Sequence, residues 1–504
     1  MSRWVEVRRG TYHDSVTLMR VSRQVGEVAG VSGAMAAMAT EPNLEMFARM
    51  GFEPPAGAGP SDLVVAIRAD GDEALRAARD TLEELLRSSR EQRAGNGGAA
   101  VAGAAPPART TGAAARRRPD AGIALISVPG PHVLPEAMDA LDAGLNVMIF
   151  SDNVPLEQEI ALKDTAARRG LIVMGPDCGT ALVGGAGLGF ANAVRPGPVG
   201  LVAASGTGAQ QLMCLLDAAG VGVGHALGVG GRDLSEEVSG RSALAALAAL
   251  DADPGTELIV LVSKPPAPRV AGLVREAARR LDTPVVFAFP GPEDDLTRAA
   301  ERALTLLGRS VPPWPRWAPS RPVPERVAGG LRGLFSGGTL RDESAAIVTA
   351  AGGDPAAHGH ELVDFGDDAY TRGRAHPMID PALRLEALAR HAADPGCGVL
   401  LLDVVLGYGA DPDPAASLAP AIAAALKGRD DLAAVVSLCG TPADPQGRDG
   451  QAEALSAAGA AVFASNAEAT RHALGLCEGV PATVRGGHGD GDGGADGQTG
   501  DADD

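Results

Sequence analysis

The chain is poor in aromatic residues and in positive charge. Aromatic side chains make up only 3% of its 504 residues, whereas hydrophobic residues reach 45%. Any buried core is therefore built mainly from small and aliphatic side chains, as expected of an α/β protein. The 44 Lys and Arg residues face 63 Asp and Glu residues, which gives a net charge of −19. This overall field opposes binding to nucleic acid or to an anionic membrane, and we expect neither partner.

Cysteine is scarce as well, and long apolar runs are missing. The five cysteines are widely spread and form no C-x-x-C pair, which suits a reducing compartment and offers no framework for a metal. His358 and His360 lack a third ligand, so we expect no metal site. No window reaches the roughly 18 apolar residues of a membrane span, and residues 1–6 lack the apolar core of a signal peptide. We therefore predict a soluble cytoplasmic protein.

What the sequence does contain is an alternation of apolar strands and amphipathic helices. Residues 199–204 are a continuous apolar run, and residues 257–262 and 398–405 are apolar apart from Glu257 and Asp403. Helical patterns separate such runs. This alternation predicts an α/β fold with parallel, doubly wound sheets, and the length predicts several domains. The expected parts are a small α+β domain (1–90), a flexible linker (91–118), a Rossmann-like domain (119–194), a doubly wound domain (195–310), a proline-rich linker (311–330), a second doubly wound domain (331–478) and a disordered acidic tail (479–504).

Two glycine-rich turns share one pattern, in which an apolar strand leads through a tight turn into a helix. They consist of Ser205, Gly206, Thr207 and Gly208, and of Ser336, Gly337, Gly338 and Thr339. Such turns present backbone N–H groups and the positive end of a helix dipole to an anion, and hydroxyl groups add donors. The pair predicts a site for a phosphate or carboxylate between two helix ends. The alternative is that each turn is only a close strand–helix junction.

Several segments resemble one enzyme family. Residues 123–131, 136–144 and 174–179 resemble the CoA-binding domain of the succinyl-CoA synthetase α subunit. The Ser205 turn and residues 228–233 are similar to the ligase domain of the same subunit. Residues 334–342 resemble the glycine turn in the C-terminal domain of the β subunit. Together with residues 7–16, this order of motifs is similar to the FdrA group of acyl-CoA-synthetase-like proteins.

The resemblance implies a Rossmann-like CoA-binding-type domain followed by two flavodoxin-like ligase domains. In the synthetases, a phosphohistidine is held between two helix N-termini from different subunits, so this chain would carry both halves of that clamp. The resemblance also implies CoA as a possible cofactor. The implied cofactor-binding residues are Val128, Pro129, Gly130, Pro131 and Asn153.

The chain departs from the family in three respects. The glycine-rich loop that grips the CoA phosphate in the family has no clear counterpart before Gly122, where Gly/Ala linker sequence stands. Strand 285–289 leads into residues 290–295 without the histidine that the α subunit carries there, and no segment is long enough for an ATP-grasp domain. The resemblance therefore implies an acyl-CoA-ligase-like protein that handles an acyl or phosphoryl anion within an oligomer containing a second subunit. One alternative is a subunit of an oxamate-type carbamoyltransferase in purine and allantoin breakdown, which uses carbamoyl phosphate. Another is a structural or regulatory subunit without catalysis.

Two histidines are candidate catalytic residues. His376 lies in a polar loop before a proline, and His225 lies on a strand that leads into residues 228–231. Each has a structural alternative, which is a loop-anchoring network for His376 and a satisfied core position for His225. Arg232, Asp233 and Asp403 are further candidates, because ligands of open α/β sheets collect at the carboxyl edge of the strands.

Overall fold

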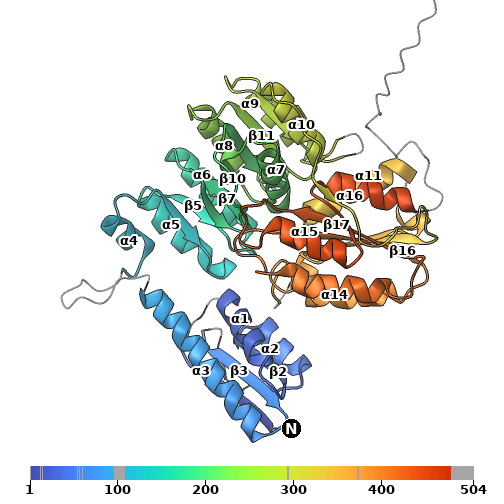
Figure 1. Cartoon of the computed structure of the whole chain (residues 1–504). Helices are drawn as coiled ribbons and strands as arrows, with labels where there is room; N and C mark the ends of the chain where they lie inside the picture. Colours follow the sequence, from blue (N-terminus) through green and yellow to red (C-terminus); the bar gives the residue numbers. More distant parts are fainter. Residues whose placement is uncertain are drawn as a thin grey trace, which may run out of the picture. The chain divides into compact units, whose positions relative to one another are not determined.

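The chain forms two compact units, and Figure 1 labels many of their elements. The computed structural model describes residues 2–95 and 108–477, apart from 12, 14, 54, 56, 60, 292, 293, 353, 372 and 373. The first unit comprises Met1–Ala114 and Gly366–Asp380, and the rest of the chain belongs to the second. Within the described ranges, no helix has the length and apolar character needed to cross a membrane. The predicted tail over 479–504 lies outside the described residues.

The first unit is a small α+β domain, as predicted, with an antiparallel sheet of order β1-β3-β2. Alternate residues of β3 point to opposite faces, so Leu63 and Ile67 join one apolar cluster, while Val64 packs with Phe47 in another. Its elements are β1 (Ser2–Arg8), α1 (Ser15–Gly26), β2 (Val31–Met38), α2 (Glu41–Arg49), β3 (Leu63–Ala69), α3 (Asp72–Gly95) and α12 (Asp368–Thr371).

The Rossmann-like domain has a parallel sheet of order β4-β5-β6, whose helices bury apolar residues such as Val133 and Leu162. The linker expected over 91–118 is partly wrong, because it contains the end of α3 and the helix α4. Ala115 of α4 packs against the apolar core, and this contact stabilises the helix. The elements are α4 (Thr111–Arg117), β4 (Ile123–Ile126), η1 (Gly130–His132), α5 (Val133–Asp142), β5 (Asn146–Ile149), α6 (Leu156–Arg168) and β6 (Val173–Met174).

The next domain is doubly wound, with sheet order β12-β11-β9-β10 and the hairpin β7-β8 added beside β10. Strands β9 and β11 are buried along their whole length, as continuous apolar strands are at the centre of a parallel sheet. The elements are β7 (Thr180–Val183), β8 (Ala186–Gly189), β9 (Val199–Ala203), α7 (Gly206–Ala218), β10 (Val223–Gly228), α8 (Arg241–Asp251), β11 (Leu258–Val262), α9 (Pro268–Ala278), β12 (Val285–Ala288) and α10 (Leu296–Leu306).

The last domain repeats this topology, with sheet order β13-β18-β17-β16-β14-β15. Counted along the chain from β14, the parallel strands have the flavodoxin order 2-1-3-4-5, and β9 to β12 follow the same rule. The prediction of two domains of one kind is confirmed. The elements are β13 (Arg316–Trp317), β14 (Gly330–Phe335), α11 (Gly338–Gly352), η2 (Ala356–His358), β15 (Glu361–Asp364), α13 (Ala382–Ala392), β16 (Cys397–Val405), α14 (Pro414–Leu426), β17 (Ala433–Cys439), α15 (Arg448–Ala457), β18 (Ala461–Phe463) and α16 (Asn466–Leu476).

The proline-rich segment 311–330 is more than the linker that its composition predicts. Strand β13 pairs antiparallel with β18 and extends the last sheet. Trp314 is buried, and its Nε1 donates a hydrogen bond to Glu301 at 3.2 Å. The guanidinium of Arg448 lies over the Trp317 ring, 5.4 Å from its centroid. The segment therefore belongs to the packed structure, because its two tryptophans anchor it to both doubly wound domains.

Candidate functional site

The two glycine turns meet, as the sequence predicted. Ser205 caps α7 by accepting a hydrogen bond from the N–H of Gly208, and its Oγ lies 2.6 Å from Oγ1 of Thr339. A Cβ placed on Gly337 would lie 2.9 Å from the Thr207 side chain, closer than real Cβ contacts. The absence of a side chain at Gly337 therefore allows the N-terminal turns of α7 and α11 to touch. We call this contact the α7–α11 junction.

The second turn already holds an anion, which is the carboxylate of Asp403 on β16. Asp403 accepts hydrogen bonds from the N–H of Ser336 at 2.7 Å, from its Oγ at 2.9 Å and from the N–H of Gly337 at 2.8 Å. Arg384 on α13 lies 3.0 Å from the same carboxylate, and both side chains are buried. Burial lowers the pKa of Arg384, and the charge of Asp403 opposes this shift. Ser336 and Gly337 thus have internal partners for the donors that were expected to bind a ligand.

The first turn has no comparable internal anion. Among the described residues, no carboxylate accepts a hydrogen bond from the N–H of Gly206 or Thr207, and both residues are half-buried. Strand pairing explains this difference. Leu334 pairs with Leu402, and Ala203 pairs with Val262. The place that Asp403 takes beside the second turn is therefore taken by a serine, Ser263, beside the first.

A lysine that the sequence analysis missed follows that serine directly. The Nζ of Lys264 lies 3.3 Å from Asp342 Oδ2, and its side chain is half exposed. A Cβ on Gly338 would lie 3.2 Å from this Nζ and 2.5 Å from Oδ2 of Asp364. Lys264 therefore lies beside the carboxylates of Asp342 and Asp364 at the junction, and Arg341 on α11 also pairs with Asp342, at 2.9 Å. The sequence could have indicated this lysine, because Lys264 lies just after β11, the strand that pairs with β9.

One of the predicted catalytic histidines, His225, does not join this group in the described structure. His225 pairs with Gly200, near the start of β9, whereas the first glycine turn follows the end of that strand. The Nδ1 of His225 accepts a hydrogen bond from the N–H of Gly184 at 3.2 Å, which matches the structural alternative. His376 belongs to the first unit, where its Nδ1 accepts a hydrogen bond from the N–H of Met378. Its catalytic role stays a prediction.

The implied cofactor-binding residues come together at the carboxyl edge of the Rossmann-like sheet. A Cβ on Gly130 would lie 2.4 Å from the carbonyl oxygen of Asn153, so the loop after β4 packs directly on the loop after β5. Pro129, Pro131 and Asn153 are exposed, and Val128 is half-buried. The loop after β10 also reaches this edge, because a Cβ on Gly230 would lie 2.5 Å from the carbonyl oxygen of Pro176. We call this group of loops the Rossmann edge.

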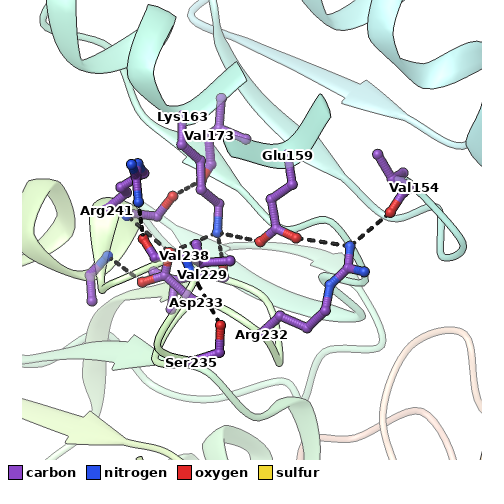
Figure 2. A network of polar contacts seen from close by, with 12 residues as sticks. Val154, Glu159, Lys163, Val173, Val229, Arg232, Asp233, Ser235, Val238 and Arg241 are labelled. Atoms are coloured by element: carbon purple, nitrogen blue, oxygen red, sulfur yellow. Dashed lines mark hydrogen bonds and ion pairs between the residues drawn. The ribbon is translucent and has the colours of Figure 1, made fainter. Parts of the chain in front are cut away.

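A buried charge network ties the Rossmann-like domain to the loop after β10 (Figure 2). The Nζ of Lys163 on α6 lies 2.8 Å from Glu159 Oε1 and 2.7 Å from Asp233 Oδ1. Asp233 also accepts hydrogen bonds from the first N–H groups of α8. Arg232 completes the network, with its Nη2 2.8 Å from Glu159 Oε2. Every charge in the network has an opposite partner, which buried charges require.

Two family matches cover different parts of the chain. Residues 1–102 match a family described as AllF, heavy metal-associated domain, and residues 334–476 match the CoA-ligase family. The second match contains the Ser336 turn, Asp403 and the elements from the end of β14 to α16. The CoA-ligase resemblance expected from residues 334–342 is thereby confirmed at the level of the family.

Individual proteins match as well. The uncharacterized protein YahF of Escherichia coli K12 is 38% identical over 509 residues, covering 92% of this chain and 97% of YahF. Succinate–CoA ligase [ADP-forming] subunit alpha 2 of Archaeoglobus fulgidus is 30% identical over 215 residues, covering 38% of this chain and 74% of that protein. The structure of ATP citrate lyase from Methanothrix soehngenii with citrate and coenzyme A matches at 19% identity and a TM-score of 0.33, covering 40% of this chain and 38% of that one. That score is too low to transfer a ligand position.

The match to a heavy metal-associated domain raises the question of whether residues 1–102 could bind a metal ion. Residues 1–102 contain no cysteine, the usual ligand for soft metals. In the part of the chain that the structure describes, no three His, Cys, Asp or Glu side chains gather to hold an ion. The described residues of the first unit therefore do not fit a heavy-metal site.

Proposed function

The chain belongs to the same family as Escherichia coli YahF, and we propose that it is a CoA-ligase-type enzyme that moves an acyl group between coenzyme A and phosphate. The observation that carries this proposal is the α7–α11 junction, together with the CoA-ligase match over the domain that supplies α11. The similarity of 215 residues of the chain to a succinate–CoA ligase α subunit supports it. We also propose that the chain belongs to the FdrA group of acyl-CoA-synthetase-like proteins.

In this proposal, the first turn binds the phosphate. The N–H groups of Gly206 and Thr207 would donate to its oxygens, and Lys264 would balance the charge that develops on them. CoA, when bound, supplies the thiol that carries the acyl group. The Rossmann edge would hold this cofactor through the loops that contain Gly130 and Asn153.

A second subunit is part of the proposed function. Residues 290–295, which directly follow strand 285–289, contain no histidine to relay a phosphoryl group, and no segment of this chain is long enough for an ATP-grasp domain. Nucleotide chemistry would then come from another polypeptide, and the two would act as an oligomer in the cytoplasm. Co-purification of such a subunit with the full chain would support this part, and ATP-dependent formation of acyl-CoA by the full chain alone would contradict it.

A carbamoyl phosphate-dependent transferase is the second candidate. The absence of the histidine after β12 favours it, because that chemistry needs no phosphohistidine. The two candidates share a phosphate at the first turn and differ in their use of CoA. Binding of carbamoyl phosphate by a full chain that does not bind CoA would support the transferase over the ligase.

Calorimetric titration of the full chain with CoA, inorganic phosphate and acetyl phosphate tests the main proposal. We expect Lys264→Met to weaken binding of phosphate and acetyl phosphate about tenfold, because a charge-assisted contact is lost, and to leave CoA binding unchanged. Lys427→Met is the matched control, because Lys427 is an exposed lysine at the end of α14. Equal phosphate affinity in the Lys264 and Lys427 variants would contradict the assignment of the phosphate site.

A further inference from the structure

The Rossmann edge has one side chain with a permanent positive charge. Its four loops cover residues 127–132, 151–155, 175–179 and 229–233, and all of them lie within the described part of the chain. Arg232 is their single Lys or Arg, whereas Asp152 and Asp177 place exposed negative charges on the same loops. An anionic ligand at this edge would meet a repulsive surface if Arg232 were absent.

Arg232 is fixed at this edge by groups from another domain. Its Nη2 donates a hydrogen bond to the carbonyl oxygen of Val154 at 2.8 Å and pairs with the carboxylate of Glu159 (Figure 2). Glu159 is buried and is itself held by Lys163. The Arg232 side chain nevertheless remains 49% exposed. The guanidinium is therefore oriented by a buried network while part of it stays open to solvent.

The neighbours of Arg232 connect it to the implied cofactor contacts. Val154 directly follows Asn153, whose carbonyl oxygen lies against Gly130. A Cβ placed on Gly231, directly before Arg232, would lie 4.0 Å from Oδ2 of Asp177. Arg232 therefore stands where the loops after β5, β6 and β10 approach one another.

We propose that Arg232 binds a phosphate group of the CoA-type cofactor at the Rossmann edge. This inference rests on the proposed function, because it assumes that CoA binds there. CoA carries phosphates that need compensating charge, and a guanidinium can donate two parallel hydrogen bonds to a phosphate. Glu159 is the positioning residue, because its carboxylate holds the guanidinium without itself reaching the ligand.

The competing explanation is that Arg232 only ties two domains together. Arg241 provides a matched control for this explanation. Its Nε lies 2.7 Å from Asp164 on the same helix α6, and it also donates to the carbonyl oxygen of Val238. Arg241 thus makes a tie between the same two domains, outside the loops of the Rossmann edge.

The test is calorimetric titration of the full chain and of its Arg232→Gln and Arg241→Gln variants with CoA and with pantetheine, which lacks the phosphates. We expect Arg232→Gln to weaken CoA binding about tenfold and to leave pantetheine binding within about twofold. We expect Arg241→Gln to leave both affinities within about twofold. Arg232→Lys should restore part of the CoA affinity, because it keeps the charge and loses the paired donors.

Three results would overturn the inference. Equal CoA affinity in Arg232→Gln and the unaltered chain would show that no phosphate contacts the guanidinium. Equal losses in Arg232→Gln and Arg241→Gln would show a domain tie and leave the proposed function intact. No CoA binding by the unaltered chain would overturn the proposed function and this inference with it.

Discussion

The two glycine turns look alike in sequence and differ in what they hold. Each follows the first strand of a flavodoxin-like sheet and begins a helix, α7 or α11. The second turn binds the buried carboxylate of Asp403, whereas the first has Ser263 at the corresponding place. The residue on the neighbouring strand therefore decides whether such a turn is a structural joint or is open to a ligand. A turn motif alone does not make that distinction.

The largest expected effect comes from removing the internal anion. Asp403→Ala would leave Arg384 buried without its partner and two N–H groups without acceptors, so we expect a loss of about 3–5 kcal/mol in unfolding free energy. Ser263→Ala, the corresponding change at the first turn, should cost less than about 1 kcal/mol. Thermal and urea unfolding of both variants measure the difference. Similar losses of stability at the two positions would show that Asp403 and Ser263 do not have different roles at the two turns.

The helices that begin at the two turns should differ in their response to pH. Helix α11 buries the carboxyl of Glu343, and burial, followed by the nearby charge of Asp295, raises its pKa to about 7. The folded state then binds more protons than the unfolded state above the ordinary pKa of 4.5. Stability should therefore fall as the pH rises from about 4.5 to 7, by up to about 3 kcal/mol.

Two variants isolate this effect. Glu343→Gln should flatten that part of the pH dependence, as measured by urea unfolding at pH 5 and pH 7. Helix α7 buries the neutral amide of Gln211, which donates to the carbonyl oxygen of Ala464. Gln211→Ala should lower stability equally at both pH values. An unchanged pH slope in Glu343→Gln would contradict the prediction.

The second turn should tolerate extra volume less well than the first, because Gly337 faces the other turn and Gly206 faces Thr180 of β7. Gly337→Ala would push a methyl group against Thr207, and we expect a cost of about 1–3 kcal/mol. Gly206→Ala would meet Thr180 Oγ1 at 3.3 Å, a looser contact, and should cost less. Adding Thr207→Gly to Gly337→Ala should recover part of the loss. A double-mutant cycle without coupling would show that the turns do not press on each other.

The smallest expected effect on stability is at Lys264. Its ion pair with Asp342 is half exposed on the lysine side, so Lys264→Met should change the unfolding free energy by less than about 1 kcal/mol. Asp403→Ala and Lys264→Met would then separate the two roles, because one variant loses stability and the other loses phosphate binding. A large loss of stability in Lys264→Met would assign the first turn a structural role as well.

Much of the fold could be predicted from the sequence because the central strands are runs of mostly apolar residues. Residues 199–204 and 398–405 were expected as strands, and they form β9 and most of β16. Strand β13 and helix α4 were missed, because their residues lie in segments whose composition is that of linkers. Trp314 and Ala115 are held there by packing against distant elements, which local sequence does not reveal.

The candidate site could be predicted only in part, because several of its contacts join residues that are far apart in the chain. The meeting of the two turns followed from the family resemblance, and the Ser205–Thr339 contact bears it out. Asp403 was flagged by its strand position, but its role depends on the pairing of β16 with β14. Lys264 was not flagged, because its importance depends on the approach of Gly338 from another domain. Contacts between residues far apart in the chain set these roles.

The first unit is discontinuous along the chain, and this has a consequence for how it is made. Its main part ends at residue 114, yet Gly366–Asp380 belongs to the same unit. A ribosome must therefore add residues 115–380, about two thirds of the chain that follows Ala114, before this unit can be completed. Completion of the unit depends on contacts of very high sequence separation. Such contacts slow folding. A fragment that stops after residue 114 would lack Gly366–Asp380 and would leave the first unit incomplete. Extra residues inserted in exposed turns of the second unit would leave both segments of the first unit in the chain.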